Sequence, residues 1–317
     1  MKVYAGVMNH LTVGIFHDES FSKELGKKGT ESDIVMYNRK TDQHIFTFMH
    51  PLGDKITAKS QIISSIDAAI VFCTEFTPEV GETILMLDAV GISQGMIVVP
   101  PYTEMNRLTA MTKGTSLGSF ILTEKNIPKI LENLERITSQ RDRASPPVVV
   151  VDHSFSVKGV GEVILGFVKQ GIIRKHDTLT LLPSGEEVVV RSIQMQDKDY
   201  EEAEAGSRVG LAIKGATVDV MRRGSVLCAK DCMKTSTKLK LSFIKNRFYP
   251  EIKEGVFHVT VGMQTLPIKI VKAENELLTI ELEKPVAYTS SDTFLLLDLN
   301  AKKLHLMGKG KAVDTTE

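Results

Sequence analysis

The chain has 317 residues, more than one ordinary domain contains, so we expect two or three domains. Lysine plus arginine and aspartate plus glutamate number 39 each, which excludes a strong net field that would draw the protein onto nucleic acid; any RNA contact must come from a local patch. No apolar run approaches the length of about twenty residues that spans a bilayer, and the first residues lead directly into a predicted strand. We therefore expect no signal peptide and a cytoplasmic protein. The cysteines at 73, 228 and 232 lack metal-ligand spacing, so we predict no metal site.

The first 140 residues alternate predicted strands and helices, which is typical of a doubly wound parallel sheet. In chain order, the predicted elements are a strand at 3–8, a helix at 20–27, strands at 34–38 and 44–49, a helix at 58–65, a strand at 67–73, a helix at 79–89, strands at 96–99 and 118–122, and a helix at 127–137. Ligands of such sheets bind outside the carboxyl ends of the strands. The candidate loops are therefore those after residues 8, 49 and 99.

A polar segment that ends in two prolines, at 138–147, marks a domain boundary. From 146 to 229 short apolar runs alternate with turn residues, as in a closed antiparallel barrel. After a second boundary near 230–234, further strands of period two predict another barrel. We thus predict an α/β domain at 1–140 followed by two all-β domains at 146–231 and 232–317.

Motifs of the first predicted barrel occur in one order along about eighty positions. They include Asp152, Lys158-Gly159, Gly171-Ile172-Ile173, Arg191-Ser192-Ile193-Gln194, Ala205-Gly206-Ser207-Arg208-Val209-Gly210-Leu211-Ala212 and Arg223-Gly224. The series resembles the second domain of translational GTPases of the elongation factor Tu type, and its details are most similar to the selenocysteine-specific elongation factors. The resemblance implies a P-loop-like GTPase domain followed by two antiparallel β-barrels. It also implies that the first two domains grip the acceptor end of aminoacyl-tRNA while the third touches the acceptor stem.

Aligned on this family, the phosphate-binding loop falls at residues 9–16. The family loop, Gly-x-x-x-x-Gly-Lys-Ser/Thr, holds phosphates with backbone amides and a lysine, and holds Mg²⁺ with a hydroxyl. His10 and Gly14 match this pattern, whereas Asn9 replaces its first glycine. Ile15 and Phe16 stand where the lysine and the hydroxyl are needed, and neither can bind a phosphate or a metal. We interpret these two residues as apolar helix-start residues that pack on the sheet.

The other two nucleotide loops also depart from the family. The second should resemble Asp-x-x-Gly-His, but at 50–54 only Gly53 matches, and Asp54 stands at the histidine position. His50 is interpreted as a solvated loop residue rather than a catalytic base. The third loop should resemble Asn-Lys-x-Asp, but the chain has Pro100-Pro101, with no carboxylate to recognise guanine and two backbone donors lost.

These departures lead to a prediction about GTP. The segment that should close over the γ-phosphate is also short, because only residues 29–33 separate the predicted first helix from the next strand. We predict a pseudo-GTPase with no catalytic residue and no cofactor. GTP and Mg²⁺ belong only to the alternative, a working GTPase with unorthodox residues. A protein-binding regulatory scaffold is a further alternative.

The resemblance places candidate tRNA contacts in the first barrel. Asp152 matches an acidic position near the aminoacyl pocket, and His153, partly charged near neutral pH, stands where arginine is common, which bears on specificity for a selenocysteinyl group. Lys158, Arg191 and Arg208 are candidate contacts to the tRNA end; the simpler explanation for the three is a solvated surface charge, and for Asp152 a strand-end cap or turn. tRNA or the ribosome is the predicted partner, with a protein partner possible and no membrane or DNA. Because the chain ends at 317, we expect it to lack the RNA-reading extension of the selenocysteine-specific factors.

Overall fold

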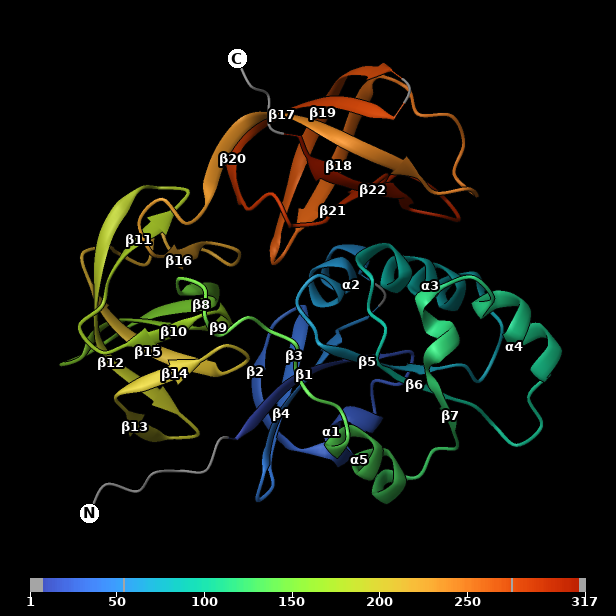
Figure 1. Ribbon diagram of the computed structural model, residues 1–317, viewed down its shortest axis with the longest axis horizontal. Helices are drawn as coiled ribbons and strands as arrows, with labels where there is room; N and C mark the ends of the chain where they lie inside the picture. Colours follow the sequence, from blue (N-terminus) through green and yellow to red (C-terminus); the bar gives the residue numbers. More distant parts are fainter. Residues whose placement is uncertain (1–7, 54, 275, 314–317) are drawn as a thin grey trace. The chain divides into compact units, whose positions relative to one another are not determined.

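The computed structural model describes residues 8–53, 55–274 and 276–313 (Figure 1). Contacts divide the chain into two compact units, one of residues 1–140 with 298–306 and the other of residues 141–297 with 307–317. Within the described part of the chain, no helix is both long enough and apolar enough to cross a bilayer.

The first unit is built on a seven-stranded sheet with the strand order β2-β3-β4-β1-β5-β6-β7. Its strands are β1 (Asn9–Phe16), β2 (Lys27–Glu31), β3 (Ile34–Lys40), β4 (His44–Pro51), β5 (Ala68–Phe72), β6 (Gly95–Val98) and β7 (Ile121–Thr123). Strands β4, β1, β5, β6 and β7 run parallel, and β2 and β3 add an antiparallel edge. The predicted α/β sheet is thus confirmed.

Helices cover both faces of this sheet, as parallel strands require. They are α1 (Phe21–Leu25), α2 (Ile56–Ile63), α3 (Pro78–Val90), α4 (Met105–Thr112) and α5 (Ile127–Glu135), with a 3₁₀ turn at Ser116–Ser119. Helices α1 and α5 lie on one face, and α2 and α3 on the other (Figure 1). Phe21 of α1 and Leu134 of α5 pack in one apolar cluster with Val13 and Ile70 of the central strands.

The start of the first unit differs from the sequence prediction. The strand predicted at 3–8 lies outside the described residues except for Met8, which is in no strand. Residues 9–16, predicted to be a phosphate loop, instead form the central strand β1, in which Leu11, Val13 and Ile15 are 1% exposed or less. Both faces of this strand are buried, so polar His10 and Thr12 are buried as well, and burial along β1 has no period that marks where the strand ends.

Smaller differences have similar causes. The helix predicted at 20–27 is only Phe21–Leu25, and β2 begins at Lys27 and includes most of the predicted short switch segment. Helix α4 was not predicted, because only Leu108 and Thr112 on it are buried. The strand predicted at 118–122 begins instead as the 3₁₀ turn, with β7 after it.

The second unit contains two closed antiparallel barrels, which confirms the predicted all-β part. The first has the strand order β11-β16-β8-β9-β15-β12, closed by pairing of β12 with β11, and β13 extends it. Its strands, with the small β10–β14 pair, are β8 (Val148–Val157), β9 (Gly161–Gln170), β10 (Ile172–Arg174), β11 (Thr178–Leu182), β12 (Glu186–Met195), β13 (Lys198–Tyr200), β14 (Glu202–Glu204), β15 (Arg208–Lys214) and β16 (Val226–Cys228).

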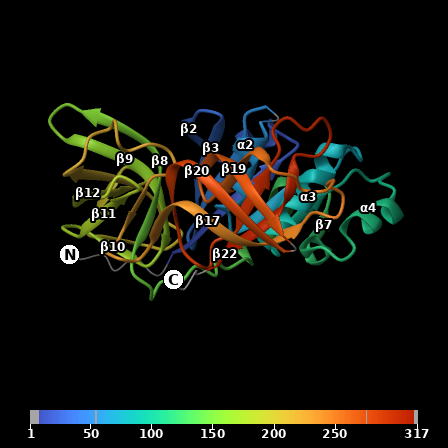
Figure 2. The same cartoon turned by 90° about the horizontal axis from the view of Figure 1, so that it is seen from above.

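The second barrel has the order β17-β20-β19-β18-β21-β22 and is closed by pairing of β22 with β17 (Figure 2). Its strands are β17 (Lys234–Lys245), β18 (Gly255–Val261), β19 (Gln264–Glu274), β20 (Leu277–Tyr288), β21 (Phe294–Leu297) and β22 (Leu306–Ala312). Along β17 the buried Leu239, Leu241 and Phe243 alternate with exposed residues. This alternation separates the barrel interior from its outer surface, because successive side chains of a strand point to opposite faces.

Candidate functional site

The loop after β1 occupies the position of a phosphate-binding loop in the first unit. It consists of only four residues, His17–Ser20, between the end of β1 and the start of α1. It contains neither glycine nor lysine. Asn9 and His10 lie at the other end of β1, roughly 25 Å away at strand spacing, and Gly14, Ile15 and Phe16 lie within the strand. The prediction that residues 9–16 line the nucleotide site is therefore wrong for Asn9 and His10, because these residues form the amino end of a strand rather than a loop.

Asp18 organises this short loop. Its Oδ1 accepts hydrogen bonds from the Ser20 hydroxyl at 2.7 Å and the Phe21 amide at 3.0 Å, and its Oδ2 accepts one from Lys125 Nζ at 2.6 Å. Partial burial by itself would raise the pKa of Asp18, but these hydrogen bonds outweigh it and hold the pKa below its ordinary value. The carboxylate thus ties the loop to the first amide of α1 and to Lys125, which follows β7.

Lys125 lies above an aromatic floor. Its ammonium nitrogen is 5.5 Å from the centre of the Phe21 ring and 5.7 Å from that of Phe72. The two rings meet edge to face at 4.8 Å. The cation is therefore held by a carboxylate and by two ring faces at once.

His50 and Gly53 come from the second nucleotide loop. His50 belongs to β4 and is 2% exposed, so its interpretation as a solvated loop residue is wrong. Burial lowers the pKa of His50, its Nδ1 lies 3.2 Å from the Pro51 carbonyl oxygen, and its ring stacks on Tyr37. A neutral imidazole that donates from Nδ1 leaves Nε2 as an acceptor. Gly53 is exposed with φ 67°, and Asp54 lies outside the described residues.

A cavity of about 330 Å³ opens between these loops. It is lined by Ile15, Phe16, His17, Asp18, Glu19, His50, Pro51, Gly53 and Lys59. Asp18 and Glu19 thus line the space beside the end of β1. Among the described residues, no three histidine, cysteine, aspartate or glutamate side chains group so that they could hold a metal ion.

The third nucleotide loop follows β6. Thr103 donates from its amide at 3.1 Å and from its hydroxyl at 2.7 Å to the Pro100 carbonyl, which closes a turn over Pro101 and Tyr102. Tyr102 is 85% exposed. Both donors of Thr103 therefore bond within the turn, and the turn presents the Tyr102 ring to solvent.

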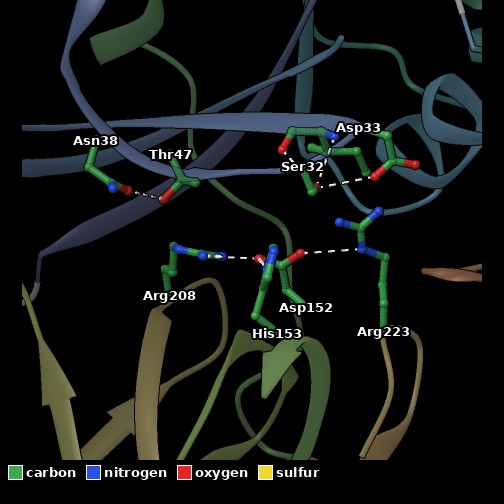
Figure 3. A network of polar contacts seen from close by, with 9 residues as sticks. Ser32, Asp33, Asn38, Thr47, Asp152, His153, Arg208 and Arg223 are labelled. Carbon is green, nitrogen blue, oxygen red and sulfur yellow. Dashed lines mark hydrogen bonds and ion pairs between the residues drawn. The ribbon is translucent and has the colours of Figure 1, made fainter. Parts of the chain in front are cut away.

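A second polar cluster lies in the second unit, around Asp152 of β8. Figure 3 shows its buried carboxylate between two arginines: Arg208 Nη2 is 3.0 Å from Oδ2, and Arg223 Nε is 3.6 Å from Oδ1. His153 Nδ1 is 2.8 Å from Oδ2. Burial by itself would raise the pKa of Asp152, but His153 and Arg208 outweigh it and hold the pKa below its ordinary value. Burial also lowers the pKa of Arg208, which Asp152 opposes.

The backbone explains how a carboxylate comes to be buried here. In the pairing of β8 with β9, Val151 lies opposite Gly166 and His153 opposite Leu165, so Asp152 is the extra residue of a β-bulge. In a regular strand successive side chains point to opposite faces, but at a bulge two consecutive side chains can both point toward the buried side. The side chains of both Val151 and Asp152 are therefore buried. The simpler reading of Asp152 as a strand-end cap is excluded, since it lies within the strand.

The structure separates the predicted tRNA contacts into two groups. Asp152, His153 and Arg208 form the buried cluster, in which Arg208 also lies 4.9 Å above the Phe167 ring. Lys158 is exposed in the turn between β8 and β9, roughly 17 Å further along the strand. Exposed Arg191 reaches the same turn by donating to the Val160 carbonyl at 3.4 Å.

Sequence reasoning did not identify Arg223 as part of the cluster. Its position after Arg222 and before Gly224 was recognised only as a family motif. Gly224 has φ 86°, and its amide donates to the Val151 carbonyl at 2.9 Å, so this turn is fixed beside β8. The proximity of Arg223 to Asp152 follows from that backbone contact, which spacing along the chain does not reveal.

Comparisons with known proteins agree with this architecture. Residues 161–228 match the family model described as elongation factor Tu domain 2. The chain is 37% identical over 309 residues to an uncharacterised protein of Methanocaldococcus jannaschii. The aligned residues cover 96% of this chain and 100% of that protein. It is 27% identical to the selenocysteine-specific elongation factor of the same organism, over 93% of this chain and 73% of that protein.

A solved structure shows the same fold. The crystal structure of translation elongation factor SelB from Methanococcus maripaludis in complex with the GTP analogue GppNHp matches with a TM-score of 0.84 at 23% identity, over 98% of this chain and 80% of that one. The matched domain model falls on the first barrel, where the sequence motifs also lie. The chain belongs to the translational GTPase family, of the elongation factor Tu and selenocysteine-specific elongation factor type.

Proposed function

We propose that this elongation-factor-like protein binds aminoacyl-tRNA, tRNA or the ribosome and neither binds nor hydrolyses GTP. The proposal that GTP is not bound rests on the four-residue loop His17–Ser20. A phosphate loop surrounds its ligand with successive backbone amides from a glycine-rich turn at a helix N-terminus. Four residues that join a strand directly to a five-residue helix leave too little backbone for that cradle.

Electrostatics also oppose a triphosphate in the cavity. Asp18 and Glu19 line it, and Asp18 remains ionised at neutral pH because its pKa is lowered. Two like charges about 4 Å apart repel by about 4 kcal/mol at the effective dielectric constant of a protein surface. Lys125 pairs with Asp18 and Lys59 also lines the cavity, so these two lysines offset part of the repulsion, and the short loop remains the main argument.

Binding of GTP is the direct test of this proposal. Isothermal titration of the full chain with GTP and Mg²⁺ should give no saturable heat up to millimolar nucleotide. The selenocysteine-specific elongation factor of Methanocaldococcus jannaschii, titrated in the same buffer, is the positive control. Magnesium-dependent binding at micromolar concentration or below would overturn the pseudo-GTPase proposal in favour of a working GTPase.

The partner half of the proposal has separate support. A relative that shares 27% identity over most of this chain is named a selenocysteine-specific elongation factor. Exposed Lys158 and Arg191 meet at one turn of the first barrel, where they can contact a phosphate backbone together. In the buried cluster, Arg208 and Arg223 are cations held in fixed positions, and both are ion-paired with the Asp152 carboxylate.

Filter binding tests this half with bulk tRNA and with aminoacylated tRNA at low and moderate salt. We expect binding that weakens as salt rises, because the contacts are to phosphates. The double variant Lys158→Gln with Arg191→Gln should bind several-fold more weakly, whereas Lys198→Gln with Lys214→Gln, two exposed sites on the same barrel, should bind as wild type does. Absence of tRNA affinity at both salt concentrations would instead favour a protein-binding scaffold.

A further inference from the structure

A second cavity, of about 430 Å³, lies where the two barrels of the second unit meet. Its lining comes from both barrels: residues 183–184 and most of 219–225 belong to the first, and residues 264–266 and 284–285 belong to the second. The volume is within the range of about 300–1,000 Å³ that is usual for pockets that hold small molecules. The cavity therefore has room for a small organic ligand that contacts both barrels.

Hydrogen bonds and close packing fix the walls of this cavity. The Gln264 side chain donates to the Ala287 carbonyl at 2.7 Å and accepts from the Ala287 amide at 2.9 Å, so it is held on β20. On the first barrel, the Ser225 amide donates to the Arg222 carbonyl at 2.9 Å, and the Ser225 hydroxyl accepts from the Arg222 amide at 3.1 Å. A Cβ atom on Gly224 would lie 2.8 Å from a carbonyl oxygen of the second barrel, so the barrels approach closely here. The cavity is therefore preformed.

Half-buried apolar side chains form part of the wall on each side. Pro183 and Val220 come from the first barrel, and Leu266 and Pro285 come from the second. Each keeps part of its apolar surface exposed, and covering such surface with the apolar atoms of a ligand is favourable. This wall therefore favours a ligand with an apolar body.

The charged side chains of the lining favour an anion. Arg222 from the first barrel and Lys284 from the second are both exposed. Among the residues that the structure describes, neither belongs to an ion pair. Arg223 also lines the cavity, but it is already paired with Asp152. The carboxylate of Asp219 opposes the two cations, so one positive charge remains in excess.

We propose that this cavity binds a small organic acid with an apolar body and a single carboxylate. The Arg222 guanidinium is planar, and its paired donors match the geometry of a carboxylate. The Lys284 ammonium adds a cation from the other barrel, and the apolar wall holds the body of the ligand. A phosphate monoester carries a charge of about −1.5 to −2 at pH 7, more than one excess cation balances, so a carboxylate monoanion fits better.

This site does not depend on the proposed function. The first-barrel residues with which that proposal is tested, Lys158 and Arg191, are not part of the cavity lining. A ligand held by both barrels stabilises the folded protein by mass action, because the unfolded chain has no such cavity. Binding of the acid is therefore measurable without tRNA, GTP or a ribosome.

Two dyes that share one fluorophore test the charge preference in the full chain. Dansyl-glycine carries a carboxylate, and dansyl-cadaverine carries an ammonium group. Dansyl-glycine should bind saturably, about ten-fold more tightly than dansyl-cadaverine, since two unpaired cations attract one and repel the other. Octanoate should displace dansyl-glycine, whereas octylamine, phenyl phosphate and inorganic phosphate at the same concentration should not.

The double variant Arg222→Gln with Lys284→Gln tests the two cations. It should weaken dansyl-glycine binding about ten-fold and abolish the preference over dansyl-cadaverine. The matched control is Lys198→Gln with Lys269→Gln, which removes the same charge from exposed positions of the two barrels outside the cavity and should bind as wild type does. All four positions are exposed, so folding should be unaffected, and circular dichroism checks this.

Two single variants separate charge from apolar contact. Asp219→Asn should tighten dansyl-glycine binding about three-fold, because it removes the charge that opposes the anion. Leu266→Ala should weaken both dyes several-fold and leave the preference between them unchanged, because it removes apolar contact only. Octanoate should raise the thermal unfolding temperature of wild type but not that of the variant of Arg222 and Lys284.

Three outcomes would overturn the inference. One is equal affinity of wild type for the two dyes, and another is unchanged dansyl-glycine binding by the variant of Arg222 and Lys284. The third is displacement of dansyl-glycine by phenyl phosphate or bulk tRNA at lower concentration than by octanoate, which would mark the cavity as a phosphate site. The proposed function is judged separately, because it depends on GTP titration and on tRNA binding by wild type and by the variant of Lys158 and Arg191.

Discussion

The carboxylate of Glu82 accepts a hydrogen bond from the backbone amide of His305 at 2.5 Å, although the two residues are 223 positions apart. The same carboxylate accepts a hydrogen bond from the Leu306 amide at 2.9 Å and lies 3.0 Å from His305 Nδ1. Glu82 is on α3 and is 4% exposed. Two consecutive amides and an imidazole thus satisfy a buried acid, and they hold the segment 298–306 on this helix.

We expect Glu82→Ala to release that segment. It would leave the amides of half-buried His305 and buried Leu306 without their acceptor, and an unsatisfied buried donor costs about 1–3 kcal/mol, so the free energy of unfolding should fall by about 1–4 kcal/mol. Hydrogen exchange at the amides of residues 305 and 306 should accelerate. The control is Glu79→Ala on the same helix, which is exposed and should cost no more than about 1 kcal/mol. Unchanged protection of both amides in Glu82→Ala would show that Glu82 does not hold the segment.

Removing the negative charge of Asp152 should lower the free energy of unfolding. Asp152→Asn keeps the shape of the side chain but leaves Arg208 and Arg223 without their negative partner. Removing one member of a buried ion pair typically costs about 3–5 kcal/mol, because the remaining charge is uncompensated. Urea denaturation at pH 7 measures the loss. Glu162→Gln, on the neighbouring strand β9, is a control that should change the free energy of unfolding by less than about 1 kcal/mol.

The same pair gives a prediction for pH. The folded pKa of Asp152 lies below 3.8, its ordinary value. A carboxyl group whose pKa is lowered on folding contributes stability above its unfolded pKa and loses it as the pH falls through the folded pKa. The difference in unfolding free energy between wild type and Asp152→Asn should therefore be constant from pH 7 to about pH 5 and shrink below about pH 4. A difference that persists unchanged to pH 2 would contradict the assignment.

Asp18 should stabilise the start of α1 as well as pair with Lys125. Asp18→Ala removes the acceptor of the Phe21 amide, and loss of a side-chain acceptor at the start of a helix costs about 0.5–2 kcal/mol. The ion pair with Lys125 is partly solvent-exposed and adds at most about 1 kcal/mol. Chemical denaturation of this variant, with the exposed Glu19→Ala as control, should show the difference. Gain of GTP binding by Asp18→Ala would show that this carboxylate alone excludes the nucleotide, contrary to the argument from the short loop.

The cysteines should differ in reactivity. Burial, and to a lesser degree the neighbouring Cys232, raise the pKa of Cys228 to about 11. At pH 8 only about 0.1% of such a thiol is thiolate, the form that reacts with iodoacetamide. Cys73 and Cys228 are buried and Cys232 is half-buried, so mass spectrometry should find Cys232 alkylated first. In urea the three should react at similar rates, and early labelling of Cys228 in the native protein would contradict its burial.

Several features follow from the amino-acid sequence by itself. The alternation of apolar and polar residues along strands such as β17 predicts barrels, because in a barrel only one face of each strand is buried. The order of motifs in the first barrel indicates the family, and the fold class follows from it. The sequence also leads to the prediction that the residue types needed to bind phosphate, magnesium and guanine are missing from the three loops.

Only the tertiary structure decided where those loops are and which charges meet. Helices cover both faces of β1, so polar His10 and Thr12 are buried beside Leu11 and Val13, and burial along the strand does not distinguish its ends. Alignment by motif therefore placed the loop within the strand. Asp152 meets Arg208 and Arg223 through a β-bulge and a turn fixed by backbone hydrogen bonds. Closure of the second barrel depends on the register between β17 and β22, which are distant in sequence. Register and bulges are set by the packing of whole barrels, so the spacing of residues along the chain does not encode them locally.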